Sequence, residues 1–121
     1  MNTRFHYMYR DASNYKYWGE VVFAGAIDDA LSGRLSRAFE STEFFIADQI
    51  GIREVFPADW PLDQDDHCWH TFVETESTNE AADDVHGRTI HRFVADVERT
   101  SIKGWKVFDP MTRARVRRKL A

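Results

Sequence analysis

The sequence predicts a single α+β domain in which a mostly antiparallel sheet carries two helices on one face. Three observations lead to this prediction. Several short stretches have the two-residue alternation or the β-branched, apolar character of strands. Only two stretches place apolar side chains at helical spacing. Loops rather than helices separate most of the strands, so the order β-β-α-β-β-α-β favours antiparallel pairing.

The first half of the chain is expected to supply a hairpin-like pair of strands and the first helix. Residues 4–10 alternate between the two faces of a strand. Residues 20–25, EVVFAG, have β-branched and apolar character, and this second strand would pair with the first across a loop at 11–18. The period then becomes helical, with Asp28 and Asp29 near the helix start, and the apolar stripe consists of Ile27, Leu31, Leu35, Ala38 and Phe39.

The second half is expected to supply three strands and the second helix. Residues 43–47, EFFIA, predict a buried strand, and a long acidic loop follows at 53–66. Residues 67–73, HCWHTFV, predict the next strand, and WKVF at 105–108 predicts a last short one. Thr89 is a suitable N-cap for a helix whose apolar stripe consists of Ile90, Phe93, Val94 and Val97.

Charge is unevenly distributed along this chain of 121 residues, whose net charge is -4. Between Glu54 and Gly87 there are ten acidic residues and no lysine or arginine. We expect residues 1–109 to form the domain and residues 110–121 to form a basic tail or helix containing Arg113, Arg115, Arg117, Arg118 and Lys119. The tail could hold phosphates, including those of a nucleic acid. Because charge runs usually face water, we favour a solvated helix that neutralises the acidic middle of the same molecule.

Several functional classes have no motif in the sequence. There is no run of eighteen apolar residues and no secretory signal, so we expect a cytoplasmic protein that does not enter a membrane. Cys68 is the single cysteine, which excludes an internal disulfide and a multi-thiol zinc site. The patterns G-x-S-x-G and H-E-x-x-H and a phosphate-cradling glycine loop are missing. We therefore expect neither a cofactor nor a metal.

The first candidate site is RDASNYKYW at residues 10–18. Asp11, Ser13 and Asn14 are residue types that close turns by bonding their own backbone, so a purely structural turn explains them. A turn does not require the cations and rings around them, although such rings often pack in a core. Cations beside aromatic faces suit an anionic ligand with a planar base. These additional residues are Arg10, Tyr15, Lys16, Tyr17 and Trp18.

The second candidate site is the stretch DDHCWH, which ends at His70. On a strand, residues three apart point to opposite faces, so His67 and His70 would not share a zinc ion unless a bulge or turn intervenes. Hydrogen bonds to neighbouring carboxylates explain them better. A histidine beside Asp66 could also act as a general base, and a nucleophilic triad would add Ser13 or Cys68. The sequence does not fix that geometry.

Three stretches in this order resemble a family of short, uncharacterised bacterial and phage-associated proteins: FHYMYRDASNYK at 5–16, FFIADQIGI at 44–52 and DDHCWH at 65–70. The resemblance spans roughly the first 70 residues and does not extend to the C-terminal half. The family brings no settled activity. The resemblance implies that the positions to test first are Tyr9, Arg10, Asp11, Ser13, Asn14, Tyr15, Lys16, Asp66, His67, Trp69 and His70.

Three functional hypotheses remain. In the one we favour, the protein binds a small, anionic, nucleotide-like ligand between the turn and DDHCWH, with phosphate on Arg10 and Lys16, and a phage-type sponge would in this way sequester a host immune signal. A homo-oligomer could place the tail of one subunit over the site of another. Alternatively, the protein is a small hydrolase or transferase whose base is His67 or His70. In the third, the acidic segment 54–87 meets a basic protein partner through Asp63, Asp65 and Asp66.

Overall fold

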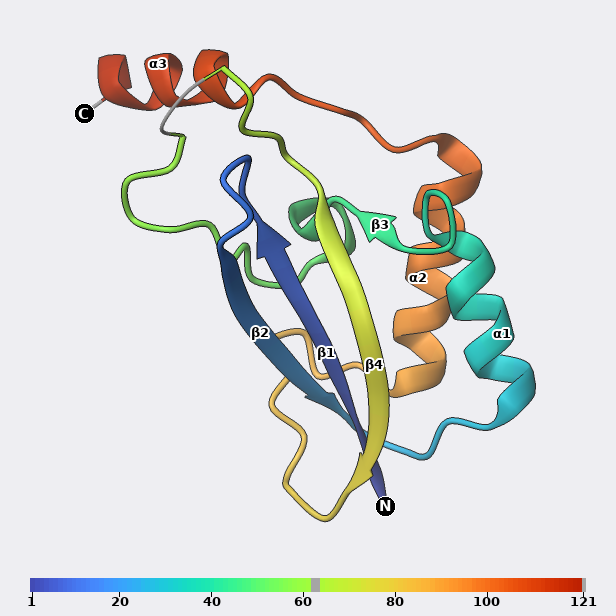
Figure 1. The fold of residues 1–121 in the computed structure, drawn as a ribbon. Coiled ribbons are helices and arrows are strands. Elements are labelled where there is room, and N and C mark those ends of the chain that lie inside the picture. Colours follow the sequence, from blue (N-terminus) through green and yellow to red (C-terminus); the bar gives the residue numbers. More distant parts are fainter. Residues whose placement is uncertain (62–63, 121) are drawn as a thin grey trace.

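A four-stranded antiparallel sheet organises the fold, and the computed structural model describes residues 1–61 and 64–120 (Figure 1). The strand order is β2-β1-β4-β3, and every pairing is antiparallel. The predicted α+β class is therefore confirmed. The bounds of the strands are Asn2–Arg10 for β1, Lys16–Phe23 for β2, Phe44–Phe45 for β3 and His70–Thr78 for β4.

Two of the three helices that the structure describes pack together against the sheet, whereas the sequence predicts two helices and leaves the tail as a tail or helix. They are α1 (Asp29–Ala38) and α2 (Ile90–Lys103), which lie side by side in Figure 1. Asp28 caps α1 by accepting a hydrogen bond from Leu31 N at 2.8 Å, and Thr89 caps α2. The tail forms a third helix, α3 (Pro110–Leu120), near the hairpin end of the sheet, and a 3-10 turn, η1 (Ala47–Ile50), follows β3. None of the helices in the described residues is both long and apolar enough to cross a membrane.

The core lies between the sheet and the two helices. Alternate residues of β1, namely Phe5, Tyr7 and Tyr9, are fully buried on the helix-facing side. Phe23 of β2 stacks on a phenylalanine of α2 with 4.2 Å between ring centroids. Opposite Tyr7 stands Gly19, where an added Cβ would lie 2.7 Å from the tyrosine Cζ atom. The glycine therefore makes room for this ring.

Four details of the predicted elements are wrong. The strand expected at 43–47 is confined to Phe44–Phe45, and η1 begins at Ala47. The second strand begins at Lys16 rather than at residue 20, so the connection from β1 is a tight turn. The strand expected at 67–73 begins only at His70 and continues through the polar run to Thr78, because residues such as Glu74 lie on the solvated face of the sheet. Residues 105–108 are not a strand. They link α2 to α3, and Trp105 packs edge-on against Trp69 with 6.4 Å between centroids.

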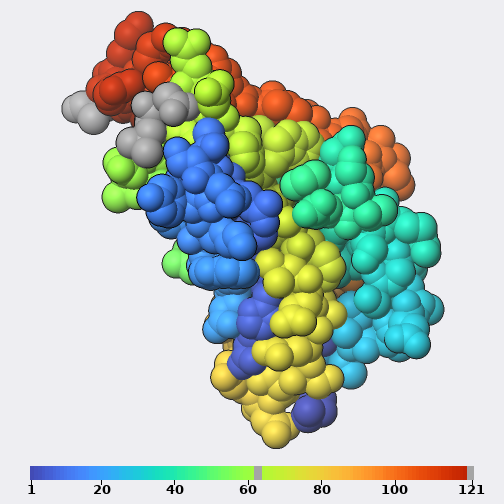
Figure 2. Space-filling view, viewed as in Figure 1, coloured from blue at the N-terminus to red at the C-terminus, as the bar shows by residue number. Residues whose placement is uncertain are grey.

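The helix-free side of the sheet, which we call the outer face, carries the remaining β1 side chains. The register pairs His6 with Glu20 and with Glu74, Met8 with Trp18, and Arg10 with Lys16. Atoms of the hairpin, in blue, and of β4, in yellow, form much of the surface that faces the viewer in Figure 2. The outer face therefore has a cationic and aromatic end near the turn and an acidic region farther along the strands.

Candidate functional site

The hairpin turn and the histidine-bearing segment meet in the structure. The backbone N–H of Ala12 donates to Asp66 Oδ1 at 3.3 Å. The His67 ring nitrogen Nε2 lies 2.8 Å from the carbonyl oxygen of Arg10, and the His67 backbone N–H donates to the Tyr9 hydroxyl oxygen at 3.3 Å. These hydrogen bonds connect segments more than fifty residues apart in the sequence. They also fix the end of β1.

Asp11 organises the turn. Its Oδ1 atom accepts hydrogen bonds from the backbone N–H groups of Ser13 and Tyr15, both at 2.9 Å. Asn14 has a φ of 69°, a left-handed conformation that asparagine tolerates better than most residues. Asp11 is buried, so its carboxylate serves the turn and not a ligand. A purely structural role in closing the turn therefore explains the contacts of Asp11, Ser13 and Asn14.

Both histidines are engaged by backbone groups. His67 Nδ1 accepts from the backbone N–H of Trp69 at 3.1 Å, which leaves Nε2 as the donor to the Arg10 carbonyl. His70 is fully buried, and its Nε2 accepts from the backbone N–H of Val55 at 3.0 Å. Burial lowers the pKa of His70 to about 4, so the imidazole is neutral at pH 7. In this arrangement neither ring presents a free lone pair for proton abstraction.

Tyr9 joins these parts through its hydroxyl group. The oxygen also accepts a hydrogen bond from Trp60 Nε1 at 2.9 Å. Burial raises the pKa of Tyr9 to about 12, so the phenol stays neutral. The hydroxyl of Tyr17 donates to Asp11 Oδ2 at 3.4 Å. The tyrosines thus brace the turn from the core side. Trp69, which directly precedes His70, is half-buried.

The exposed side chains of the hairpin include both cations and two of the rings. Arg10 and Lys16 are directly paired across β1 and β2, and both are exposed. Among the described residues, neither forms an ion pair with a carboxylate. Trp18 is 62% exposed and lies two residues from Lys16, so both side chains are on the outer face. Tyr15, at 68% exposure, extends from the turn.

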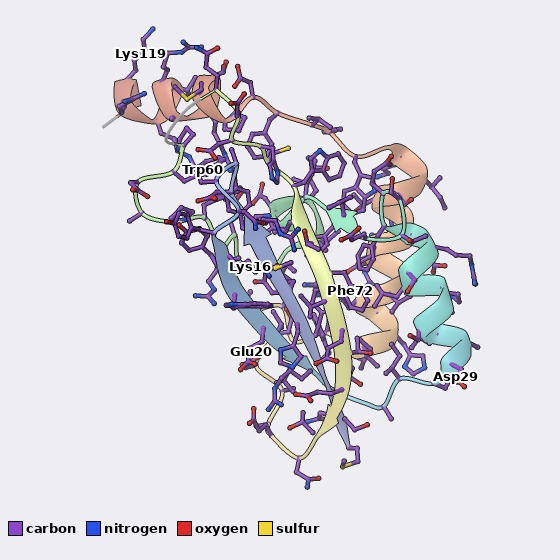
Figure 3. All side chains as sticks on the ribbon, in the orientation of Figure 1. Lys16, Glu20, Asp29, Trp60, Phe72 and Lys119 are labelled. Atoms are coloured by element: carbon purple, nitrogen blue, oxygen red, sulfur yellow. The ribbon has the colours of Figure 1, made fainter. Side chains whose placement is uncertain are left out.

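An acidic band crosses the outer face beyond this cationic end. His6 Nε2 lies 2.8 Å from Glu76 Oε1, and Arg4 bonds the same carboxylate at 2.5 Å. These two partners lower the pKa of Glu76. Possible ligand atoms of His6, Glu74 and Glu76 lie within 4.8 Å of one another. Because the Arg4 guanidinium already binds Glu76, the cluster is better described as an ion-pair network than as a metal site. In Figure 3, Glu20 marks this band on β2 and Lys16 the cationic end.

The basic tail meets the acidic middle of the chain within the molecule. Arg113 of α3 forms an ion pair with Glu54 at 2.5 Å, and its guanidinium lies 4.3 Å from the centre of the Phe108 ring. This contact agrees with the expected neutralisation. Cys68 is buried beside this C-terminal segment, and burial raises the pKa of its thiol. Asp63, which we named for the acidic surface, lies outside the described residues.

A large cavity lies elsewhere, where the sequence did not point. It is a groove of about 1170 Å³ between η1, the loop before α2, and α2 itself. A smaller cleft of about 300 Å³ separates residues 58–61 from α3. Comparison of the chain with family models, with curated proteins and with solved structures finds no match.

Proposed function

We propose that the protein is a binding module for a small, anionic, nucleotide-like ligand, held at the hairpin end of the outer face. One observation carries the proposal. Arg10 and Lys16 are exposed opposite each other without a carboxylate partner among the described residues, next to the exposed indole of Trp18. Cations of a protein are commonly neutralised by nearby acids, as Arg4 is here. Two cations that are not neutralised and that lie beside an aromatic ring suit a ligand in which a phosphate is attached to a base.

The three side chains would divide the recognition. The Arg10 guanidinium presents a fork that bonds two phosphate oxygens, while Lys16 acts as a mobile point charge. A base stacked on Trp18 would gain about 1–3 kcal/mol. The hydrogen bonds of Asp11 and His67 hold the backbone of the turn, so binding would not have to order the loop.

The acidic band favours a small ligand over a nucleic acid. Glu20, Glu74 and Glu76 lie on the same outer face as the cations, farther along the strands. A polyanion running along the sheet would approach these carboxylates and be repelled. A mononucleotide or a dinucleotide could stay at the hairpin end. Sequestration of a host immune signal stays a hypothesis that rests on the resemblance to phage-associated proteins.

Binding without turnover is favoured by the engaged histidines. The ring nitrogens of His67 and His70 are hydrogen-bonded to backbone groups. Each histidine would have to break such a bond before it could act as a base. We therefore expect the ligand to be recovered unchanged after incubation. Chromatographic detection of a new product would favour the hydrolase or transferase hypothesis instead.

Isothermal titration calorimetry against linear, cyclic and dinucleotide ligands, with inorganic phosphate as a reference, tests the proposal. We expect Arg10→Gln, Lys16→Gln and Trp18→Ala each to weaken binding by about tenfold, which corresponds to about 1.4 kcal/mol. Arg37→Gln, which removes an exposed cation from α1, is the matched control and should leave affinity unchanged. Absence of heat for every ligand, or equal losses in the control, would refute the proposal.

A further inference from the structure

The groove beside α2 is lined by a separate set of charged residues. None of its described lining residues belongs to the hairpin turn or to the stretch DDHCWH. Arg53 comes from the chain after η1, Arg88 precedes α2, and Arg92 and Arg99 come from α2 itself. We propose that this groove is a second binding site, for a ligand that carries two or more phosphate groups.

The charges in the groove are not balanced. Asp96 accepts hydrogen bonds from three guanidinium groups: Arg88 at 3.4 Å, Arg92 at 3.2 Å and Arg99 at 2.8 Å. A second carboxylate, that of Asp84, pairs with Arg88 alone. Within the part of the chain that the structure describes, two acids therefore serve three arginines, and one positive charge of this network remains uncompensated.

Arg53 and Asp48 complete the charged lining. Arg53 adds a cation that has no ion pair among the described residues. Asp48, in the first turn of η1, also lines the groove, and its carboxylate balances one positive charge without belonging to the Asp96 network. Together with the uncompensated charge of that network, the groove keeps a positive excess in a protein whose net charge is -4.

Arg88 builds the wall of the groove and is not available to a ligand. Its side chain is only 9% exposed, and it binds the Asp84 carboxylate through Nε at 2.9 Å and Nη2 at 3.1 Å. It also donates to the backbone carbonyls of Ile50 and Gly51, at 2.9 and 3.2 Å. These bonds tie η1 to the start of α2. A ligand would therefore enter a groove whose two sides are already fixed.

Arg92 and Arg99 are the groups that can turn to a ligand. Their side chains are 65% and 54% exposed, although both contact Asp96. They are seven residues apart on one helix face, which separates their backbones by about 10 Å. From backbones that far apart, both guanidinium groups reach the same oxygen of Asp96, so they lie close together at the groove. A ligand with several linked phosphates can bond both of them through charge-assisted hydrogen bonds. The described lining contains no Phe, Tyr or Trp, so the phosphates, not a base, would be recognised.

Titration with inorganic tripolyphosphate and with orthophosphate at one fixed ionic strength tests this inference. We expect tripolyphosphate to bind at least tenfold more tightly than orthophosphate, and the double variant Arg92→Gln, Arg99→Gln to lose at least tenfold in affinity. The matched control Arg34→Gln, Arg37→Gln removes the same charge from α1. An equal loss in that control, or no preference for tripolyphosphate, would overturn the proposal.

The wild-type protein gives an independent readout that does not depend on a variant folding. In a ¹⁵N NMR titration with tripolyphosphate, we expect amide shifts at residues 48–53 and 86–99, whether or not the hairpin amides also shift. Shifts confined to the hairpin would refute a site in the groove. The variant Arg10→Gln, Lys16→Gln should keep tripolyphosphate binding in the groove, so the two proposed sites can fail separately.

Discussion

His70 should make the fold sensitive to moderate acid. The imidazole is fully buried, and burial lowers its pKa from 6.5 to about 4 in the folded protein. In the unfolded chain it titrates near its ordinary value. Between these two values the unfolded state binds more protons than the folded state, so the free energy of unfolding falls as the pH is lowered. The full contribution is present above pH 6.5, and it is lost as the pH falls toward 4.

The size of this loss follows from the two pKa values. Each pH unit within the window costs up to about 1.4 kcal/mol, so the total approaches about 3 kcal/mol at pH 4. Carboxylates with a lowered pKa, such as Asp84 and Glu98, contribute stability that is lost only below the ordinary carboxyl range. His70 therefore accounts for most of the change in the free energy of unfolding between pH 6.5 and the ordinary carboxyl range.

Urea unfolding followed by circular dichroism at pH values from 4 to 7.5 measures this dependence. His70→Gln keeps an acceptor for the Val55 backbone N–H but cannot titrate, so its stability should be nearly flat over the window. His91→Gln, at an exposed position of α2, should retain the wild-type slope. The reasoning is refuted if the wild type and His70→Gln show the same slope between pH 6.5 and 4.

Three further substitutions test the packing around the site. Gly19→Ala should destabilise the fold by about 1–3 kcal/mol in urea unfolding, because its Cβ would fall 2.7 Å from the Tyr7 ring. Gly33→Ala, inside α1 and near only a flexible arginine end, should stabilise the fold by up to about 1 kcal/mol. If the two variants change stability in the same direction, one of the two predictions is wrong. Glu54→Gln removes the carboxylate that holds α3 and should speed labelling of Cys68 by a thiol reagent several-fold. An unchanged rate would show that this ion pair does not protect the thiol.

Local sequence patterns were sufficient for the helices and for most of the strands. Asp28 lies at the predicted start of α1, and Thr89 is the predicted N-cap of α2. Both accept a capping hydrogen bond from the backbone N–H three residues later, although for Asp28 the sequence predicted only a place near the helix start. Alternation in β1 correctly identified its buried face. These features depend on residues within a few positions of one another, which is the range that periodicity and capping describe.

Features that depend on distant pairing were missed. β4 extends through Glu74 and Glu76 because its partner β1 places their side chains in water beside Arg4 and His6. No local pattern distinguishes this from a polar loop. The groove was missed for the same reason, since its walls come from η1 and α2, which are joined by the side chain of Arg88.

The position of unbalanced cations is a better guide to anion binding than the number of cations. The tail is the most basic stretch of the sequence, yet Arg113 is paired with Glu54. At net charge -4 the molecule as a whole does not attract anions at long range, so binding must come from a few directed hydrogen bonds at short range. Arg10 with Lys16 and Arg92 with Arg99 can provide such bonds. Single substitutions at these positions should therefore alter affinity, whereas changes of total charge elsewhere should not.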